Sequence, residues 1–345
     1  MTHHPTTVAV DLSMTVFEVG VADRQWQIVE RRRLNRRQFA RFLADQPASH
    51  VVMEACGTAH YWGRVAQGHG HRVSLLPVRY VKPYLRGNKT DRTDVDALLD
   101  AVRTGHIPPV TVKTVAQQEI VALHRIREQW MATRTARINA LRGFFREHGL
   151  PLPAGPRTSL AAVPALAEQL PPQLALAITS VYEDARTLEM RIANLEKQLR
   201  AIAKDDAIVQ RRLDIPGIGL LTATALVGSV GRITAFRRGR QFASWLGLTP
   251  REHSSGPRRH LGSITKRGNV YLRCLLTHGA RAVLLTAQRQ AAAHKPLTGL
   301  QPWAVQLAAR KGHNKTTIAV ANKLARIVWA VWARDAAYTA APAAA

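Results

Sequence analysis

Residues 7–21 read TVAVD-LSM-TVFEVGV, and this stretch decides the fold at the start of the chain. Its two halves, Thr7–Asp11 and Thr15–Val21, are rich in β-branched residues, which favours β-strands. Only the link Leu12-Ser13-Met14 separates them, so we expect an antiparallel hairpin. The first strand ends in a carboxylate, Asp11.

Strands and helices alternate after the hairpin. The hydrophobic periodicity predicts, in order, a helix over Arg36–Asp45, a strand over His50–Glu54, a helix over Tyr61–Gly68, a strand over Arg72–Leu76 and a helix over Thr93–Thr104. This alternation is typical of an α/β sheet. We therefore assign residues 1–112 to an α/β domain.

The middle of the chain, residues 113–206, is predicted to be helical. A long helix over Gln117–His148 is followed by a proline-rich break over Leu150–Pro156. Apolar residues then recur at alternating spacings of four and three, the pattern of a coiled-coil seam: Val181, Ala185, Leu188, Ile192, Leu195, Leu199 and Ile202. The same spacing also fits one helix of an intramolecular bundle, so the seam is either a dimer element or an internal one.

The last region, residues 207–335, is predicted to be mostly α. It opens with Pro216-Gly217-Ile218-Gly219 between two helical stretches, a pattern typical of a helix-hairpin-helix. Glycines at such a hairpin let backbone N–H groups approach a phosphate, although a plain turn between helices would look the same. A basic loop runs from Arg251 to Arg267, and the alanine-rich tail over 336–345 is predicted to be disordered.

The overall charge points to a polyanionic partner. The chain carries 49 Lys and Arg against 23 Asp and Glu, a formal net charge of +26. This excess is spread along the whole chain, which fits a long phosphate track better than a small anionic ligand. A solvated basic surface is the alternative, but the pattern favours nucleic acid.

Cysteine content and hydropathy limit the setting of the protein. The two cysteines, Cys56 and Cys274, form neither a disulfide framework nor a zinc-finger pattern, which favours a reduced, cytoplasmic setting. No signal segment or membrane span is expected, since no apolar run approaches the roughly 20 residues that a span needs.

Four carboxylates are candidates for a metal site: Asp11 and Glu54 at strand ends, and Asp91 and Asp94 within Asn88-Lys-Thr-Asp-Arg-Thr-Asp94. Taken singly, each could be a turn residue, a surface acid or a helix cap. Together they are expected to meet at one edge of the sheet, because strand-end acids converge there and residues three apart share a helix face. All-oxygen ligands suit Mg²⁺ or Mn²⁺, which assist phosphoryl transfer.

A second group of polar residues is the loop Arg251-Glu-His-Ser-Ser-Gly-Pro-Arg-Arg-His260. A serine in this loop is either a phosphate contact or a nucleophile activated by a base or a metal. No triad spacing decides between these roles.

In combination, these motifs resemble a known family, the DEDD transposases of the insertion-sequence 110 family, which are related to the Piv DNA invertases. The motifs that carry the resemblance are Val-Ala-Val-Asp11, Val-Val-Met-Glu54-Ala-Cys-Gly-Thr, Asn-Lys-Thr-Asp91-Arg-Thr-Asp94, Ile-Pro-Gly-Ile-Gly219, Phe242-Ala-Ser-Trp-Leu-Gly-Leu-Thr-Pro250, and Ser255-Gly256 before Lys266-Arg-Gly-Asn269. The resemblance runs from about residue 7 to about residue 330.

The resemblance implies a ribonuclease H or RuvC-like fold for the α/β domain. It places the metal-binding acids at Asp11, Glu54, Asp91 and Asp94, and the catalytic serine at Ser255, next to Ser254. It also implies covalent attack of the serine on double-stranded DNA and a structured guide RNA. Because Ser255 lies more than 150 residues after Asp94, the fold or another subunit has to bring them together, so we expect a homo-oligomer, dimer or tetramer. The expected nucleic-acid contacts are Lys89, Arg92, Gly217, Gly219, Arg251, Arg258, Arg259, Lys266 and Arg267.

The resulting hypothesis is a metal-assisted serine recombinase of a mobile element. Its rivals are a RuvC-type endonuclease that uses activated water, and a nucleic-acid scaffold without catalysis. A serine hydrolase acting on esters is disfavoured, because the charge of +26 would have no role in it.

Overall fold

The computed structural model describes residues 6–88 and 90–340, which form two compact units. The first unit contains the chain up to Gln118 together with Val230–Ala235, and the second contains Glu119–Ser229 and the chain from Phe236 onward. The predicted contact Lys89 and the tail positions 341–345 lie outside the described residues. In the described part of the chain, none of the helices has the length and apolar character needed to cross a membrane.

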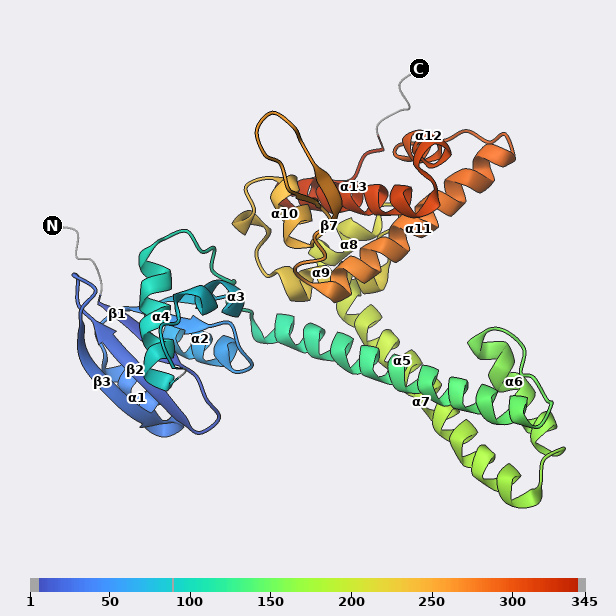
Figure 1. Ribbon diagram of the computed structural model, residues 1–345, viewed down its shortest axis with the longest axis horizontal. Coiled ribbons are helices and arrows are strands. Elements are labelled where there is room, and N and C mark those ends of the chain that lie inside the picture. The colour runs from blue at the N-terminus through green and yellow to red at the C-terminus, as the bar shows by residue number, and fades with distance from the viewer. Residues whose placement is uncertain (1–5, 89, 341–345) are drawn as a thin grey trace. The chain divides into compact units, whose positions relative to one another are not determined.

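The first unit, at the blue end of the chain in Figure 1, is built on a mixed sheet. Its five strands are hydrogen-bonded in the order β3-β2-β1-β4-β5. The strands are β1 (Thr7–Asp11), β2 (Val16–Ala22), β3 (Ile28–Asn35), β4 (His50–Glu54) and β5 (Arg72–Leu76). The predicted hairpin is confirmed, since β1 and β2 pair antiparallel, whereas β1, β4 and β5 run parallel. Strand β3 was not predicted, because its three consecutive arginines are typical of a solvated segment and not of a strand. It lies at the edge of the sheet.

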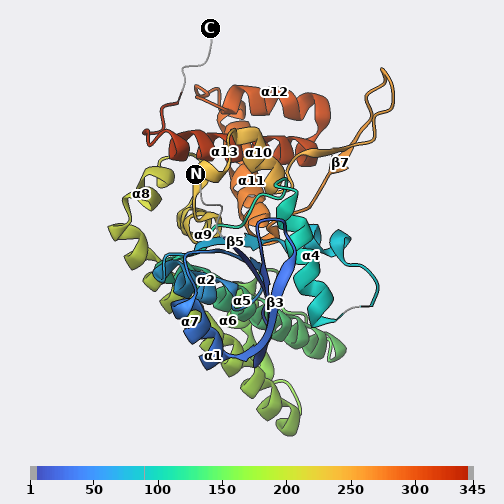
Figure 2. The same cartoon turned by 90° about the vertical axis from the view of Figure 1, so that its left-hand side faces the viewer.

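Helices cover both faces of this sheet (Figure 2). Val8, Val10 and Met53 point into a core that is shared with α1 (Arg36–Asp45) and α2 (Ala59–Gly68). The alternate strand residues, among them Ala9 and Val52, point to a second core shared with α4 (Asp91–Arg103). The short helices α3 (Val78–Val81) and η1 (Lys82–Tyr84) lead from β5 to α4. The face toward α4 is the one that concerns the candidate site. Side chains alternate along a strand, so Asp11 lies on the same face as Ala9, and Glu54 on the same face as Val52.

Two long helices make up much of the second unit, although the first of them starts within the first unit and enters the second at Glu119. Helix α5 runs from Val115 to Glu147, α6 from Pro156 to Ala167 and α7 from Pro172 to Asp205. Three ion pairs link α5 to α7 in antiparallel register: Arg127–Glu196, Arg134–Glu189 and Arg137–Asp184. The central seam positions of α7, from Ala185 to Leu199, are buried within the chain. The internal alternative for the seam therefore describes this structure.

The rest of the second unit is a helical bundle that carries a small hairpin. Its elements are α8 (Ala207–Leu213), α9 (Leu220–Val230), α10 (Gly239–Trp245), β6 (Pro250–Glu252), β7 (Leu261–Ile264), α11 (Val270–Ala292), α12 (Gln301–Lys311) and α13 (His313–Ala333). The short helix η2 (Ile233–Ala235) belongs to the first unit. Helix α13 packs against α10, α11 and α12. Strands β6 and β7 form the hairpin that carries Ser255, where the sequence indicated only a loop.

Candidate functional site

Asp11 and Glu54 end two adjacent parallel strands. The β1–β4 register pairs Val10 with Met53, so the next step along both strands brings Asp11 beside Glu54. Neighbouring strands lie about 4.8 Å apart. Each acid lies two residues after one that faces α4, Ala9 on β1 and Val52 on β4, so it points to the same face. The sheet therefore fixes the backbones of these two acids side by side on the face that α4 covers.

The other two predicted acids lie in the first turn of α4. Thr90 is the N-cap of this helix, and it forms a capping box with Thr93. Neither Asp91 nor Asp94 is therefore the cap, which removes the simplest structural explanation for them. Asp94 lies four residues before Leu98, which is fully buried against the sheet, so Asp94 is on the sheet-facing side of α4.

A fifth carboxylate, which the sequence patterns did not predict, lies beside Asp11 on the same face of the sheet. Glu18 on β2 is the direct cross-strand partner of Asp11, and its side chain is only 5% exposed. Its carboxylate oxygens lie 3.9 Å from Arg33 Nε of β3 and 3.9 Å from Arg92 Nε of α4. The alternation of Phe17, Val19 and Val21 could have revealed Glu18, because it puts a carboxylate opposite the apolar face of the strand.

These acids suit a divalent metal by their chemistry. They are hard oxygen donors on β1, β4 and α4, and α4 packs on both strands. In the described part of the chain, no three His, Cys, Asp or Glu side chains come close enough together to hold a metal ion. Arg33 Nη2 lies 4.0 Å from Asp91 Oδ2, so a guanidinium group neighbours the acids.

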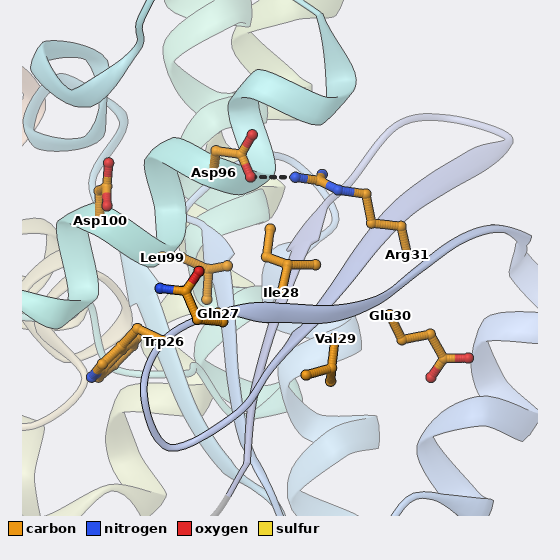
Figure 3. A pocket seen from close by; sticks show the side chains of 9 residues that line it. All are labelled: Trp26, Gln27, Ile28, Val29, Glu30, Arg31, Asp96, Leu99 and Asp100. Atoms are coloured by element: carbon orange, nitrogen blue, oxygen red, sulfur yellow. Dashed lines mark hydrogen bonds and ion pairs between the residues drawn. The ribbon is translucent and has the colours of Figure 1, made fainter.

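The remaining acids of α4 belong to a separate hollow between β3 and α4, shown in Figure 3. This hollow has a volume of about 610 Å³ and is lined in part by Trp26, Leu99, Asp96 and Asp100. Asp96 is paired with Arg31, as the dashed line shows, and Asp100 is paired with Arg86. Neither acid belongs to the predicted metal set, and each has an arginine partner instead.

Ser255 lies in the turn of the β6–β7 hairpin, which stands away from the helices of its unit in both Figure 1 and Figure 2. The neighbouring Ser254 is engaged, since its hydroxyl donates to Glu252 over 2.9 Å and accepts from the His260 N–H. Hydrogen bonds from Arg259 and Ser254 hold the pKa of the Glu252 carboxyl below its ordinary value. Among the described residues, none forms a hydrogen bond with the Ser255 hydroxyl.

A basic hollow lies beside the start of this hairpin. It has a volume of about 440 Å³, and three guanidinium groups line it together with polar side chains. The lining residues are Arg238, Arg240, Gln241, Ser244, Thr249, Pro250, Glu252 and Arg259. Arg238 and Arg240 were not predicted as contacts, although guanidinium groups and hydroxyls are the usual ligands of phosphate oxygens.

The predicted nucleic-acid contacts occupy different environments. Arg92, Arg251, Arg258, Lys266 and Arg267 are exposed, and Arg259 is exposed but paired with Glu252. Gly219 is exposed as well. Gly217 is packed instead, because a Cβ atom there would lie 2.9 Å from the Gly279 carbonyl oxygen of α11 and 2.7 Å from Val283.

Two family models match the chain. One, described as "Transposase" and specific to DEDD enzymes of the insertion-sequence 110 type, matches residues 8–149, which include Asp11, Glu54, Asp91 and Asp94. The other, described as "Transposase IS116/IS110/IS902 family", matches residues 210–296, which include Ser255.

Similar proteins cover nearly the whole chain. A "Probable family 20 transposase" of Pseudomonas aeruginosa is 40% identical over 96% of this chain and 98% of its own length. The "Transposase for insertion sequence element IS1111A" of Coxiella burnetii is 38% identical over 96% and 90%. A "Pilin gene-inverting protein" of Moraxella bovis is 27% identical over 82% and 79%. The family models and these relatives together show that the chain belongs to the DEDD transposases of the insertion-sequence 110 family.

Proposed function

We propose that this transposase cuts and rejoins double-stranded DNA through covalent attack by Ser255, assisted by a divalent metal ion that Asp11, Glu54, Asp91 and Asp94 bind. Membership of the family implies a DNA-cleaving and rejoining enzyme that uses a divalent metal. The observation that supports the proposal is the pair of carboxylates at adjacent strand ends, Asp11 and Glu54, on the sheet face that α4 covers with Asp91 and Asp94 in its first turn. Bound Mg²⁺ or Mn²⁺ would supply charge stabilisation for the phosphoryl group in flight.

In the proposed step, Ser255 exchanges one phosphate ester for another. Its Oγ forms a bond to phosphorus, one bridging P–O bond of the DNA breaks, and the released DNA hydroxyl takes up the proton that the serine loses. The phosphodiester energy is kept in the serine ester, so a second DNA hydroxyl can reverse the reaction and rejoin the strands. Simple hydrolysis would lose that energy and would not need a serine.

The identity of the serine is supported by the hairpin itself. The Ser254 hydroxyl is committed to Glu252 and to the His260 N–H, whereas Ser255 has no competing hydrogen bond among the described residues. The basic hollow that contains Arg238, Arg240 and Arg259 would hold a flanking phosphate. The name of the Moraxella relative, a gene-inverting protein, fits the rejoining half of this reaction.

A structured guide RNA and an oligomeric assembly complete the proposal. The resemblance implies the guide RNA, and a net charge of +26 suits partners that carry many phosphates. The oligomer is expected because Ser255 and the acids are far apart in the chain and have to be brought together by the fold or by another subunit. Because the α7 seam is buried within its own chain, an oligomer would use other surfaces. RNA that copurifies with the protein, and the molecular mass of the purified complex, would test these two partners.

A strand-exchange assay with element-end DNA, its flanking RNA and Mg²⁺ tests the proposed reaction. Asp11→Asn should abolish both cleavage and exchange, whereas Ser255→Ala should abolish exchange and covalent DNA attachment. Cleavage that persists in Ser255→Ala would indicate the RuvC-type endonuclease. Recombination that persists in Asp11→Asn would indicate a scaffold whose acids are incidental.

A further inference from the structure

We propose that Glu18 is a positioning residue of the carboxylate site, which draws Arg33 and Arg92 away from the metal-binding acids. The inference rests on the proposed function, because it assumes that Asp11, Glu54, Asp91 and Asp94 bind a divalent cation. No residue role in that proposal depends on Glu18, so the two can fail separately.

The burial of Glu18 is the first observation. Among the described residues, Glu18 is the only Asp or Glu that is buried. Burying a carboxylate is unfavourable unless hydrogen bonds or counter-charges compensate for the lost water. A glutamine or an apolar residue would fill the same position on β2 without that cost, so the charge itself requires an explanation.

The ion pairs of Glu18 do not stabilise the fold enough to explain why a charged residue is buried at this position. Glu18 Oε2 lies 3.9 Å from Arg33 Nε, and Glu18 Oε1 lies 3.9 Å from Arg92 Nε. The two arginine side chains are 70% and 76% exposed. Ion pairs of this length, with exposed cationic partners, contribute little to folding. The arrangement instead fixes where two guanidinium groups lie relative to the acids.

Arg33 connects Glu18 to the predicted metal ligands. Its Nη2 atom is 4.0 Å from Asp91 Oδ2, while its Nε atom is 3.9 Å from Glu18. Arg33 is thus shared between two carboxylates, and Arg92 lies in the same helical turn as Asp91. If Glu18 lost its charge, Arg33 would keep its contact with Asp91, and Arg92 would be released from Glu18 in the same turn as Asp91 and Asp94. A divalent cation would then have to displace them.

The position of Glu18 gives a second reason to expect that its charge strengthens cation binding. Glu18 lies directly across from Asp11 in the β1–β2 register, which places their Cβ atoms about 5 Å apart. A carboxylate at that distance makes the potential at Asp11 more negative and attracts a cation. Both effects predict weaker metal binding when Glu18 is neutralised, although Glu18 is not itself a ligand.

Calorimetric titration of the full-length protein with Mn²⁺ tests this role. We expect Glu18→Gln to bind Mn²⁺ about three- to tenfold more weakly, as for loss of one partly screened charge near the site. Arg33→Gln should bind about threefold more tightly, because it removes a competitor for Asp91. The double variant Glu18→Gln/Arg33→Gln should return to within about threefold of the unmodified protein. Glu30→Gln is the matched control, since Glu30 lies on the neighbouring strand and pairs with Arg32.

The possible outcomes separate the explanations. Unchanged Mn²⁺ affinity in Glu18→Gln would overturn the inference, and so would complete loss of binding like that expected of Asp11→Asn, because that would make Glu18 a ligand. If Glu18→Gln does not fold, Arg33→Gln carries the test alone, and unchanged affinity there would overturn the inference. Absence of Mn²⁺ binding by the unmodified protein would instead refute the proposed function, and the inference with it.

Discussion

Asp11 and Glu54 end two central strands whose other residues are buried, whereas Ser255 lies in the turn of a hairpin whose residues 251–260 are all exposed. Metal ligands need fixed backbones, and a sheet supplies them. A nucleophile that has to reach a phosphate on a large DNA substrate can lie on a less packed segment, because DNA itself can order that segment. Exposed hairpins with few buried contacts are also the parts of a protein that open most readily.

The largest effect should come from the two adjacent serines. We expect Ser255→Ala to lower strand exchange by at least about 10³-fold, the usual result of removing a nucleophile. Ser254→Ala should lower strand exchange by about tenfold or less, because the Ser254 hydroxyl donates a hydrogen bond to Glu252 within the hairpin. A recombination assay on both variants, with binding to element-end DNA as the control, makes the comparison. The reverse ranking would move the nucleophile to Ser254.

Two glycines sharpen the contrast between packed and exposed positions. Gly217 has φ +86°, and a side chain there would meet the backbone of α11. We therefore expect Gly217→Ala to lower the free energy of unfolding by about 3 kcal/mol. Gly219→Ala should change it by less than about 1 kcal/mol, because Gly219 has open space around it. Urea unfolding measures both values, and equal losses would contradict the packing role of Gly217.

The stability of the sheet should depend on pH through His50. Burial, and then the charge of Arg72, lower the pKa of His50 from 6.5 to about 4. The folded state therefore binds this proton less readily than the unfolded chain, so the His50 contribution is present above pH 6.5 and is lost as the pH falls toward 4. We expect a loss of about 2 kcal/mol over this range. Thermal unfolding of His50→Gln should show a weaker pH dependence, and an identical dependence would exclude His50 as the cause.

The smallest effect should come from the basic tip of the hairpin. Replacing Arg258 and Arg259 by alanine should weaken DNA binding several-fold and reduce the slope of log K against log salt by about 1 to 2. The effect of Arg259 should be the smaller, because it already pairs with Glu252. Fluorescence anisotropy over a range of salt concentrations measures the slope. An unchanged slope would mean that the hairpin tip does not contact phosphate.

Much of the first unit could be predicted from local sequence patterns. Asp11 and Glu54 follow short β-branched runs, and each such run ends where the strand ends. Strand β3 was missed because Arg31, Arg32 and Arg33 are typical of a solvated surface, and only pairing with β2 makes the segment a strand. Edge strands often carry such charges, because charge discourages pairing with other chains.

The missing part of the site depends on contacts between distant segments. Glu18 becomes notable only when the β1–β2 register puts it opposite Asp11 and when Arg33 and Arg92 arrive from other elements. The motif predicts Gly217 as a phosphate contact, and it does not reveal that α11 packs against this glycine. Sequence patterns thus predicted the acids and the serine as candidates, whereas Glu18 and its arginine neighbours emerged only from the fold.

Mass spectrometry of the covalent protein–DNA product tests the central claim most directly. The protein would be incubated with element-end DNA, its flanking RNA and Mg²⁺, then denatured and digested with protease and nuclease. We predict a nucleotide attached to the peptide that contains Ser255, absent from Ser255→Ala and Asp11→Asn and retained in Ser254→Ala. DNA cleavage without any adduct, or an adduct that maps to another residue, would contradict the account.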